Sequence, residues 1–167
     1  MKSNYVVRAT KFMESFFPYM RKYKNNINIA VTEYNEHYHR AVRVCQGAVR
    51  RVLVTSDYVV KWDYDQANSK CFGGCREEYK KYQEIKDSYY SYLFAEITPI
   101  EIKGYVFYVM PRVKALGIDC NQYIDEVLTE DEYEYVFDVA EIGDVHDENW
   151  GYLDGKVKII DYACGYM

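Results

Sequence analysis

Residues 144–149 read Asp-Val-His-Asp-Glu-Asn, and twelve residues after Asn149 the chain reaches Asp161 at the end of an apolar pair. Asp144 can accept or orient a hydroxyl proton, while Asn149 and Asp161 offer the hard oxygen ligands that Mg²⁺ prefers. A carboxylate, an amide and a second carboxylate in this order are what magnesium-assisted phosphoryl transfer requires. Loops are rich in Asp and Asn, so residues 144–149 need support from the rest of the chain.

The first supporting feature is the stretch directly after this loop. Residues 156–161 read Lys-Val-Lys-Ile-Ile-Asp, and this alternation predicts a short strand that delivers Asp161 at its end. The two stretches together resemble the protein-kinase-like superfamily. They are most similar to its aminoglycoside- and choline-kinase branch, whose catalytic loop reads Gly-Asp-x-His-x-x-Asn and whose metal-binding Asp follows a short hairpin. The resemblance implies ATP and Mg²⁺ as cofactors, Asp144 as the residue acting on the acceptor, and His146 beside the phosphates.

Two strands upstream also match the family's order. Residues 51–61 form an apolar run that ends in Lys61, which looks like the family's phosphate-binding lysine. Residues 104–113 read as a buried strand running into a hinge. The resemblance implies that Met110 guards the nucleotide pocket and that Arg112–Val113 forms the hinge whose backbone contacts adenine.

Between these strands, residues 75–85 have helical composition and contain no helix breaker. In the family, such a helix carries the glutamate that positions the lysine, here Lys61. Glu78 is preferred to Glu77 for this role because apolar residues follow it at i+4 and i+7, on one face of the helix.

The chain also departs from the family. Gly47 is the only glycine where the family has a glycine-rich phosphate loop, so few backbone amides can approach phosphate there. Ile142-Gly143 replaces the His-Arg pair of protein kinases. The sequence ends six residues after Asp161, which predicts a shortened C-lobe without an activation segment or a peptide-binding helical half. Substrate recognition is the property these departures leave most open.

We therefore expect an α+β protein with a minimal protein-kinase-like fold: a five-stranded antiparallel N-lobe sheet with one main helix, and an abbreviated helical C-lobe. Residues 1–167 would form a single domain, with the N-lobe and an N-terminal helical extension at 1–113 and the C-lobe at 114–167. Strands are expected near 41–47, 49–55, 57–63, 94–98 and 104–110, and helices near 75–91, 119–128 and 130–141.

The N-terminal segment carries an apolar stripe at helical spacing, which favours a helix packed on the domain over one bound to a membrane. Thr10 or Ser3 is the expected cap of this helix, and Pro18 interrupts it. Residues 22–40 are polar and carry no clear signal. The stripe consists of Phe12, Met13, Phe16, Phe17 and Met20.

Composition fits one small cytoplasmic domain, in the host cytoplasm if the protein is viral. No apolar run approaches the roughly 20 residues of a membrane span, and the N-terminus lacks a signal-peptide core. Five cysteines without a framework of close spacings favour reduced thiols. Cys71 and Cys75 flank a Gly-Gly turn, and no matching pair follows that would complete a zinc site. His37 and His39 are interpreted as ordinary surface or core residues rather than ligands.

Charge is divided unevenly along the chain. Residues 1–114 hold 19 basic and 12 acidic side chains, a net charge of +7, whereas residues 115–167 hold 2 and 14, a net charge of −12. Such acidity argues against direct nucleic-acid binding by the C-terminal half; it usually marks a solvated helix face, and it could also attract a basic protein partner. The 20 tyrosines can fill a core or line a binding face. Abundant Tyr, Asn and Lys are also typical of A/T-rich coding genomes, such as those of bacteriophages.

The sequence thus predicts a small ATP- and Mg²⁺-dependent phosphotransferase with an unknown acceptor. The rival hypothesis is a non-catalytic kinase-like interaction protein that modulates a cellular or host partner through its acidic half or a tyrosine-rich surface. A third hypothesis is that the motifs are accidental and the chain is an unrelated acidic inhibitor.

Overall fold

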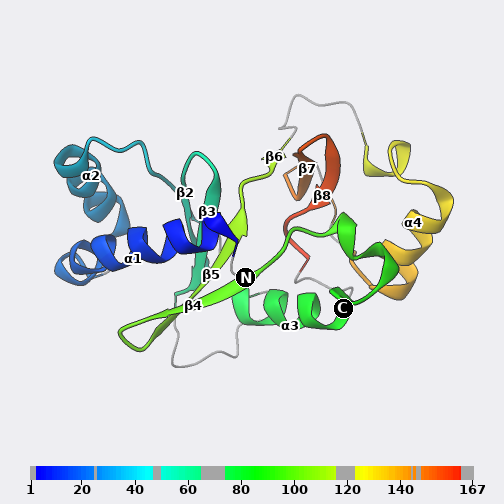
Figure 1. Ribbon diagram of the computed structural model, residues 1–167, viewed down its shortest axis with the longest axis horizontal. Helices are drawn as coiled ribbons and strands as arrows, with labels where there is room; N and C mark the ends of the chain where they lie inside the picture. Colours follow the sequence, from blue (N-terminus) through cyan, green and yellow to red (C-terminus); the bar gives the residue numbers. More distant parts are fainter. Residues whose placement is uncertain are drawn as a thin grey trace. The chain divides into compact units, whose positions relative to one another are not determined.

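The computed structural model describes residues 3–24, 26–46, 50–64, 74–115, 123–143, 145 and 148–162, and it confirms an α+β protein (Figure 1). The chain divides into two compact units. Unit 1 comprises Met1–Ser69 and Ile97–Arg112, and unit 2 comprises Lys70–Glu96 and Val113–Met167. The chain changes unit after Arg112, one residue before the expected lobe boundary, and residues 70–96 group with the later segment.

Unit 1 contains a five-stranded sheet in the order β1-β2-β3-β5-β4, with every neighbouring pair antiparallel, as predicted. Leu53, Val60 and Phe107 are among the strand residues that face the unit 1 core. Their bounds are Arg43–Gln46 (β1), Arg50–Val54 (β2), Tyr58–Asp63 (β3), Thr98–Ile102 (β4) and Tyr105–Pro111 (β5).

The strand expected at 94–98 was misplaced, because β4 begins only at Thr98. Residues Leu93–Ala95 are buried but form no regular strand, and Phe94 makes only an isolated bridge to Ile159. A short buried apolar run has no periodicity that distinguishes a strand from packed coil. Pro99 is tolerated in β4 because this strand lies at the edge of the sheet.

Helix α1 (Asn4–Lys22) packs against the sheet, and Figure 1 shows it crossing the strands. The predicted stripe from Phe12 to Met20 is buried in the unit 1 core, which confirms that this helix packs on its own domain. Ser3 occupies the N-cap position, whereas Thr10 was a wrong choice: its hydroxyl donates to the Val6 carbonyl, 2.9 Å away, inside the helix. The helix continues through Pro18, because side chains before and after this residue are buried in the unit 1 core.

Helix α2 (Ile27–Tyr38) was not predicted from the sequence. Its buried residues recur at positions 27, 30, 31 and 34, a narrow stripe within a polar segment. The Asn26 side chain accepts a hydrogen bond from the Ile29 amide and caps the helix. This stripe and this cap were present in the sequence, but the polar composition obscured them.

Unit 2 is built from short elements. Helix α3 (Cys75–Ile85) ends earlier than expected, and the 3₁₀ helix η1 (Tyr89–Leu93) follows it. In the region expected to be helical at 119–128, the described residues form only the 3₁₀ helix η2 (Ile124–Glu126). Helix α4 (Glu130–Glu134) begins with a Thr129–Glu132 capping box and widens into the π-helix η3 (Tyr135–Val139).

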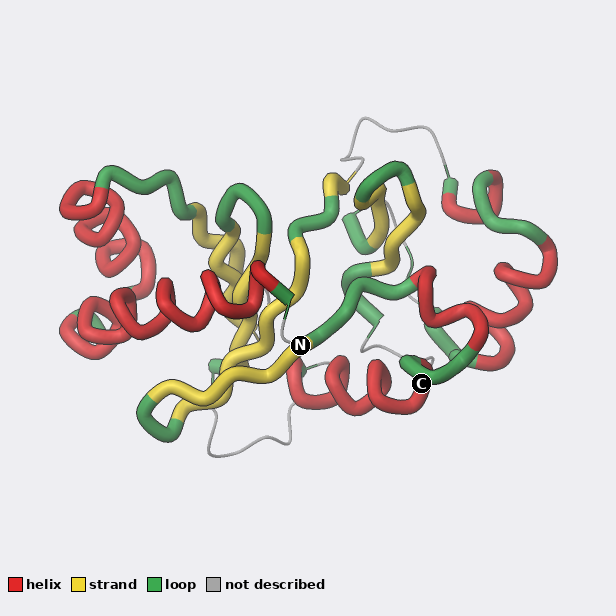
Figure 2. The backbone as a smooth tube through the Cα atoms, viewed as in Figure 1, coloured by secondary structure: helices red, strands yellow, loops and turns green. Residues whose placement is uncertain are grey.

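Unit 2 also contains a three-stranded antiparallel sheet in the order β6-β7-β8, so the expected C-lobe is not purely helical. The strands are Lys114–Ala115 (β6), Trp150–Leu153 (β7) and Lys156–Ile159 (β8), and Figure 2 shows how short they are. In the part of the chain that the structure describes, no helix combines the length and the apolar character needed to cross a membrane.

Candidate functional site

The hairpin β7–β8 places two of the predicted site residues at one end. Its turn is Asp154-Gly155, with φ values of 52° and 75°, as in the two-residue turns that join twisted strands. The register pairs Leu153 with Lys156 and Trp150 with Ile159. Asn149 directly precedes β7, and Asp161 lies two residues beyond β8. The hairpin therefore carries both polar side chains at its open end, as its Asp-Gly turn signal could have predicted.

Backbone hydrogen bonds fix this open end. The Ile160 amide donates to the Asn149 carbonyl at 2.8 Å, and the Ala95 amide donates to the Ile159 carbonyl at 2.9 Å. The Tyr162 hydroxyl, just beyond Asp161, donates to the Ala95 carbonyl at 2.7 Å. The residues around Asn149 and Asp161 are thus held to their own hairpin and to the segment after η1.

Buried side chains support the same end of the hairpin. Trp150, Ile159 and Tyr162 are fully buried, and the ring of Tyr162 lies 5.4 Å from that of Phe94 in an edge-to-face contact. Asn149 is itself only 8 % exposed. An amide held on a packed frame is positioned with little conformational freedom, which is what a ligand-binding side chain needs.

The donor chemistry of this end fits Mg²⁺. Asn149 and Asp161 supply an amide oxygen and a carboxylate, which are hard ligands, and magnesium sites commonly combine one or two protein carboxylates with phosphate oxygens and water. Among the described residues, no group of three or more His, Cys, Asp and Glu side chains is arranged to hold a metal ion. Asp144 and His146, the other two predicted residues of this loop, lie outside the described residues.

Lys61 lies on β3, the middle strand of the unit 1 sheet, and is only 7 % exposed. Tyr58, Val60 and Trp62 face the α1–α2 core, so alternation places Lys61 on the other face of the sheet. Lys61 is paired in register with Tyr108 on β5.

Met110 shares the sheet face of Lys61. It lies two residues after Tyr108 on β5 and is paired in register with Val59. Its side chain is 1 % exposed, and its role as guard of a nucleotide pocket stays a prediction. The structure therefore brings Lys61 and Met110 to one face of neighbouring strands.

Glu78 lies in the first turn of α3, and its side chain is 1 % exposed. A carboxylate is rarely buried to this degree without a polar or charged partner, which makes Glu78 unusual among the acidic residues of the helix. Neighbouring Glu77 is more exposed, in keeping with the choice of Glu78 from the helical pattern. Glu78 belongs to unit 2 and Lys61 to unit 1.

The predicted hinge begins where β5 ends. The Arg112 amide donates to the Asp57 carbonyl at 3.0 Å, and its guanidinium donates to the Thr55 carbonyl at 3.0 Å. This amide is therefore engaged, and an adenine contact at the hinge would have to use other backbone groups. Val113 is buried. Gly47, the expected phosphate-loop glycine, lies outside the described residues.

No protein-family model matches the chain, and no curated protein is significantly similar to it.

Proposed function

We propose that the protein is an ATP- and Mg²⁺-dependent phosphotransferase of the protein-kinase-like type. The observation that carries the proposal is the β7–β8 hairpin, which presents Asn149 and Asp161 at its open end on a packed frame. The strand order β1-β2-β3-β5-β4, with a buried lysine on β3, supports it from unit 1. A buried glutamate on the helix that follows β3 adds a third element in the expected chain order.

In this proposal, Asn149 and Asp161 hold Mg²⁺, and Lys61 offsets negative charge on the nucleotide phosphates while Glu78 positions it. The metal supplies charge neutralisation on the phosphate oxygens. Asp144 orients the acceptor hydroxyl and receives its proton. Phosphoryl transfer needs little covalent chemistry from the protein, so positioning and electrostatic stabilisation provide most of the rate enhancement.

A second candidate function is protein binding without catalysis. It is favoured by large aromatic side chains exposed on unit 2, where Tyr89 is 82 % and Tyr123 is 64 % exposed. Tyr and acidic residues together suit recognition of a basic partner, because the rings supply contact area and the carboxylates supply charge complementarity.

Isothermal titration calorimetry with Mg-ATP tests the first function. Wild-type protein is expected to bind Mg-ATP, and Asp161→Asn should abolish the magnesium-dependent part because it removes the anionic ligand. Asp154→Asn is the matched control at the other end of the same hairpin. Its exposed residue has a φ of 52°, and an Asn-Gly pair suits this turn.

Wild-type protein that shows no Mg-ATP binding would support the interaction hypothesis instead. Equal losses in Asp161→Asn and Asp154→Asn would show that the hairpin contributes only to folding.

A further inference from the structure

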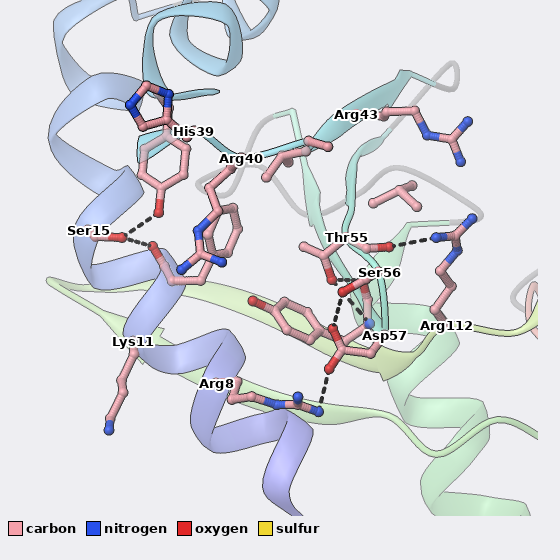
Figure 3. Close-up of a pocket in the computed structure, with 16 residues that line it drawn as sticks. Arg8, Lys11, Ser15, His39, Arg40, Arg43, Thr55, Ser56, Asp57 and Arg112 are labelled. Carbon is pink, nitrogen blue, oxygen red and sulfur yellow. Dashed lines mark hydrogen bonds and ion pairs between the residues drawn. The ribbon is translucent and has the colours of Figure 1, made fainter. Parts of the chain in front are cut away.

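A hollow of about 700 Å³ lies within unit 1. Its charged side chains are mainly cationic, whereas the predicted magnesium ligands are a carboxylate and an amide. Figure 3 shows its walls, which come from α1, the α2–β1 connection, the β2–β3 turn and the residue after β5. The volume lies within the range of roughly 300–1,000 Å³ typical of small-molecule pockets. Its cationic and hydroxyl residues are Arg8, Lys11, Ser15, Arg40, Arg43, Thr55, Ser56 and Arg112.

The β2–β3 turn forms a fixed wall of the hollow. Thr55 and Tyr58 are joined by backbone and side-chain hydrogen bonds, including one of 2.7 Å from the Thr55 hydroxyl to the Tyr58 carbonyl. Arg112 donates to carbonyls at both Thr55 and Asp57. The turn is therefore held in place before any ligand binds.

The α2–β1 connection forms a second fixed wall and carries Arg40. The Asn35 side chain donates to the Val42 carbonyl at 2.8 Å and accepts from the Val42 amide at 3.1 Å. His39 ends α2 in a left-handed conformation, with φ at 50°. In Figure 3, the Arg40 side chain extends from this connection into the space between α1 and the β2–β3 turn.

The hollow carries an excess of positive charge. Five Lys and Arg side chains line it against one carboxylate, that of Asp57, which Arg8 already pairs with. The Arg40 side chain remains exposed. Burial, followed by the nearby Asp57, raises the pKa of Tyr58 to about 12.

Aromatic side chains also line the hollow. Phe12, Tyr34 and Tyr58 line the hollow, and the Tyr34 hydroxyl is 2.8 Å from the Ser15 hydroxyl. A lining of both cations and aromatic rings suits an anionic group attached to an organic body, because the charged part can meet the guanidinium groups while the remainder contacts the rings.

We propose that this hollow binds a small phosphorylated organic molecule, with Arg40 as its main phosphate contact. A phosphate monoester carries nearly two negative charges at pH 7 and matches the planar fork of an arginine. The hollow lies on the opposite face of β3 from Lys61, because Tyr58 and Lys61 alternate along the strand, and it includes Arg112 of the predicted hinge. It does not depend on the proposed function.

The test is calorimetry on the full chain with pyrophosphate and with adenosine monophosphate, in EDTA so that no magnesium is present. Arg40→Gln should weaken binding by about 10- to 100-fold, the range of a lost hydrogen bond to a charged group. Arg40→Lys keeps the positive charge but removes the planar guanidinium with its paired donors, so a smaller loss of affinity than in Arg40→Gln is expected.

Two control variants locate the binding. Lys103→Asn removes one positive charge from unit 1, as Arg40→Gln does, but outside the hollow. Lys103 has a left-handed backbone conformation (φ 51°), which Asn tolerates. This variant should bind the probes normally. Lys61→Ala instead reports whether the probes bind at the proposed catalytic residues. If it abolishes binding, the ligand occupies the proposed catalytic residues and the inference is wrong.

Other outcomes would also overturn the proposal. One is wild-type protein that binds neither phosphate probe. Another is a hexaglutamate peptide that binds in their place, which would identify the hollow as a site for acidic polypeptide. Unchanged circular dichroism of Arg40→Gln is the folding control, and unchanged affinity in folded Arg40→Gln would equally refute the assignment.

Discussion

The two compact units differ in the length of their elements and in the sign of their charge. Unit 1 has helices of 19 and 12 residues and one sheet of five strands around a common core. Unit 2 has helical segments of 3 to 11 residues and strands of 2 to 4. Long amphipathic elements bury a continuous apolar surface, whereas short ones depend on individual large side chains and local hydrogen bonds.

The charge difference follows the same division. Unit 1 has 13 basic and 7 acidic side chains, a net charge of +6, and unit 2 has 8 and 19, a net charge of −11. In the proposed function, unit 1 supplies the cation for phosphate and unit 2 supplies the ligands for metal. Each unit then offers the sign of charge that its task requires, and the experiments below test this division of labour.

The largest expected effect separates catalysis in unit 2 from phosphate binding in unit 1. Asp144→Asn should lower phosphoryl transfer or background ATP hydrolysis by about 10²- to 10⁴-fold and leave nucleotide affinity nearly unchanged. Lys61→Ala should weaken both, because it removes charge that holds phosphate in ground and transition states alike. Steady-state kinetics and calorimetry together measure the two effects. Full cellular activity in both variants would show that the protein works by binding alone.

The next effect tests how strongly unit 1 depends on its core. Phe16 is fully buried, with its ring 5.7 Å from Phe12 and 5.4 Å from Tyr34. Phe16→Ala should lower the free energy of unfolding by about 3–5 kcal/mol in a denaturant titration. Val7→Ala on the same helix, at a residue 42 % exposed, should change it by no more than about 0.5 kcal/mol. Similar losses in both variants would contradict the assigned core face of α1.

A matched pair of turns compares the units directly. Gly104 in unit 1 and Gly155 in unit 2 have φ values of 82° and 75°, and an added Cβ would meet no atom within 4 Å at either. Replacing either by Ala should therefore cost about 1–2 kcal/mol through backbone conformation alone, measured by denaturant titration.

Only Gly155→Ala should also reduce stabilisation by Mg-ATP in a thermal-shift assay, because its turn sets the register that places Asn149 and Asp161. An equal reduction in Gly104→Ala would argue against a special role for the β7–β8 hairpin.

The smallest effect concerns a surface contact of unit 2. The Tyr92 hydroxyl donates to Glu132 at 2.5 Å, and this bond, with a smaller contribution from burial, raises the pKa of Tyr92 to about 12. Tyr92→Phe should lower the free energy of unfolding by about 0.5 kcal/mol near neutral pH.

When the pKa of a tyrosine is higher in the folded protein than its unfolded value of about 10, the tyrosine makes its full contribution to the free energy of unfolding below pH 10. That contribution is lost as the pH rises from 10 towards 12, so the difference between wild type and Tyr92→Phe should shrink in that window. A difference that grows instead would contradict the hydrogen bond. Urea titrations at several pH values measure it.

Local pattern predicted much of the fold. The strands β2, β3 and β5 are apolar runs and the helix α1 carries a stripe at helical spacing, and each was expected close to its observed position. Helix α2 was missed because its four buried residues are diluted by polar neighbours. The misplacement of β4 has another cause: nothing in an apolar run specifies whether its backbone pairs with a strand or packs as coil.

The two candidate sites also differ in whether they depend on local or distant segments of the chain. Asn149 and Asp161 could be predicted to lie together because a hairpin is a local structure, and its two ends are fixed by one short turn. The basic hollow was not found, because Arg8, Arg40 and Arg112 come from segments far apart in the chain.

The sequence by itself determined which residues alternate, which helices are amphipathic and which carboxylates and amides sit at the ends of a hairpin, since these properties depend on neighbours a few residues away. Only the tertiary structure decided the strand order of the sheet, the face on which Lys61 lies and the gathering of arginines beside α1. Those features depend on contacts between distant segments, and their free energy comes from burying a shared surface that no local pattern encodes.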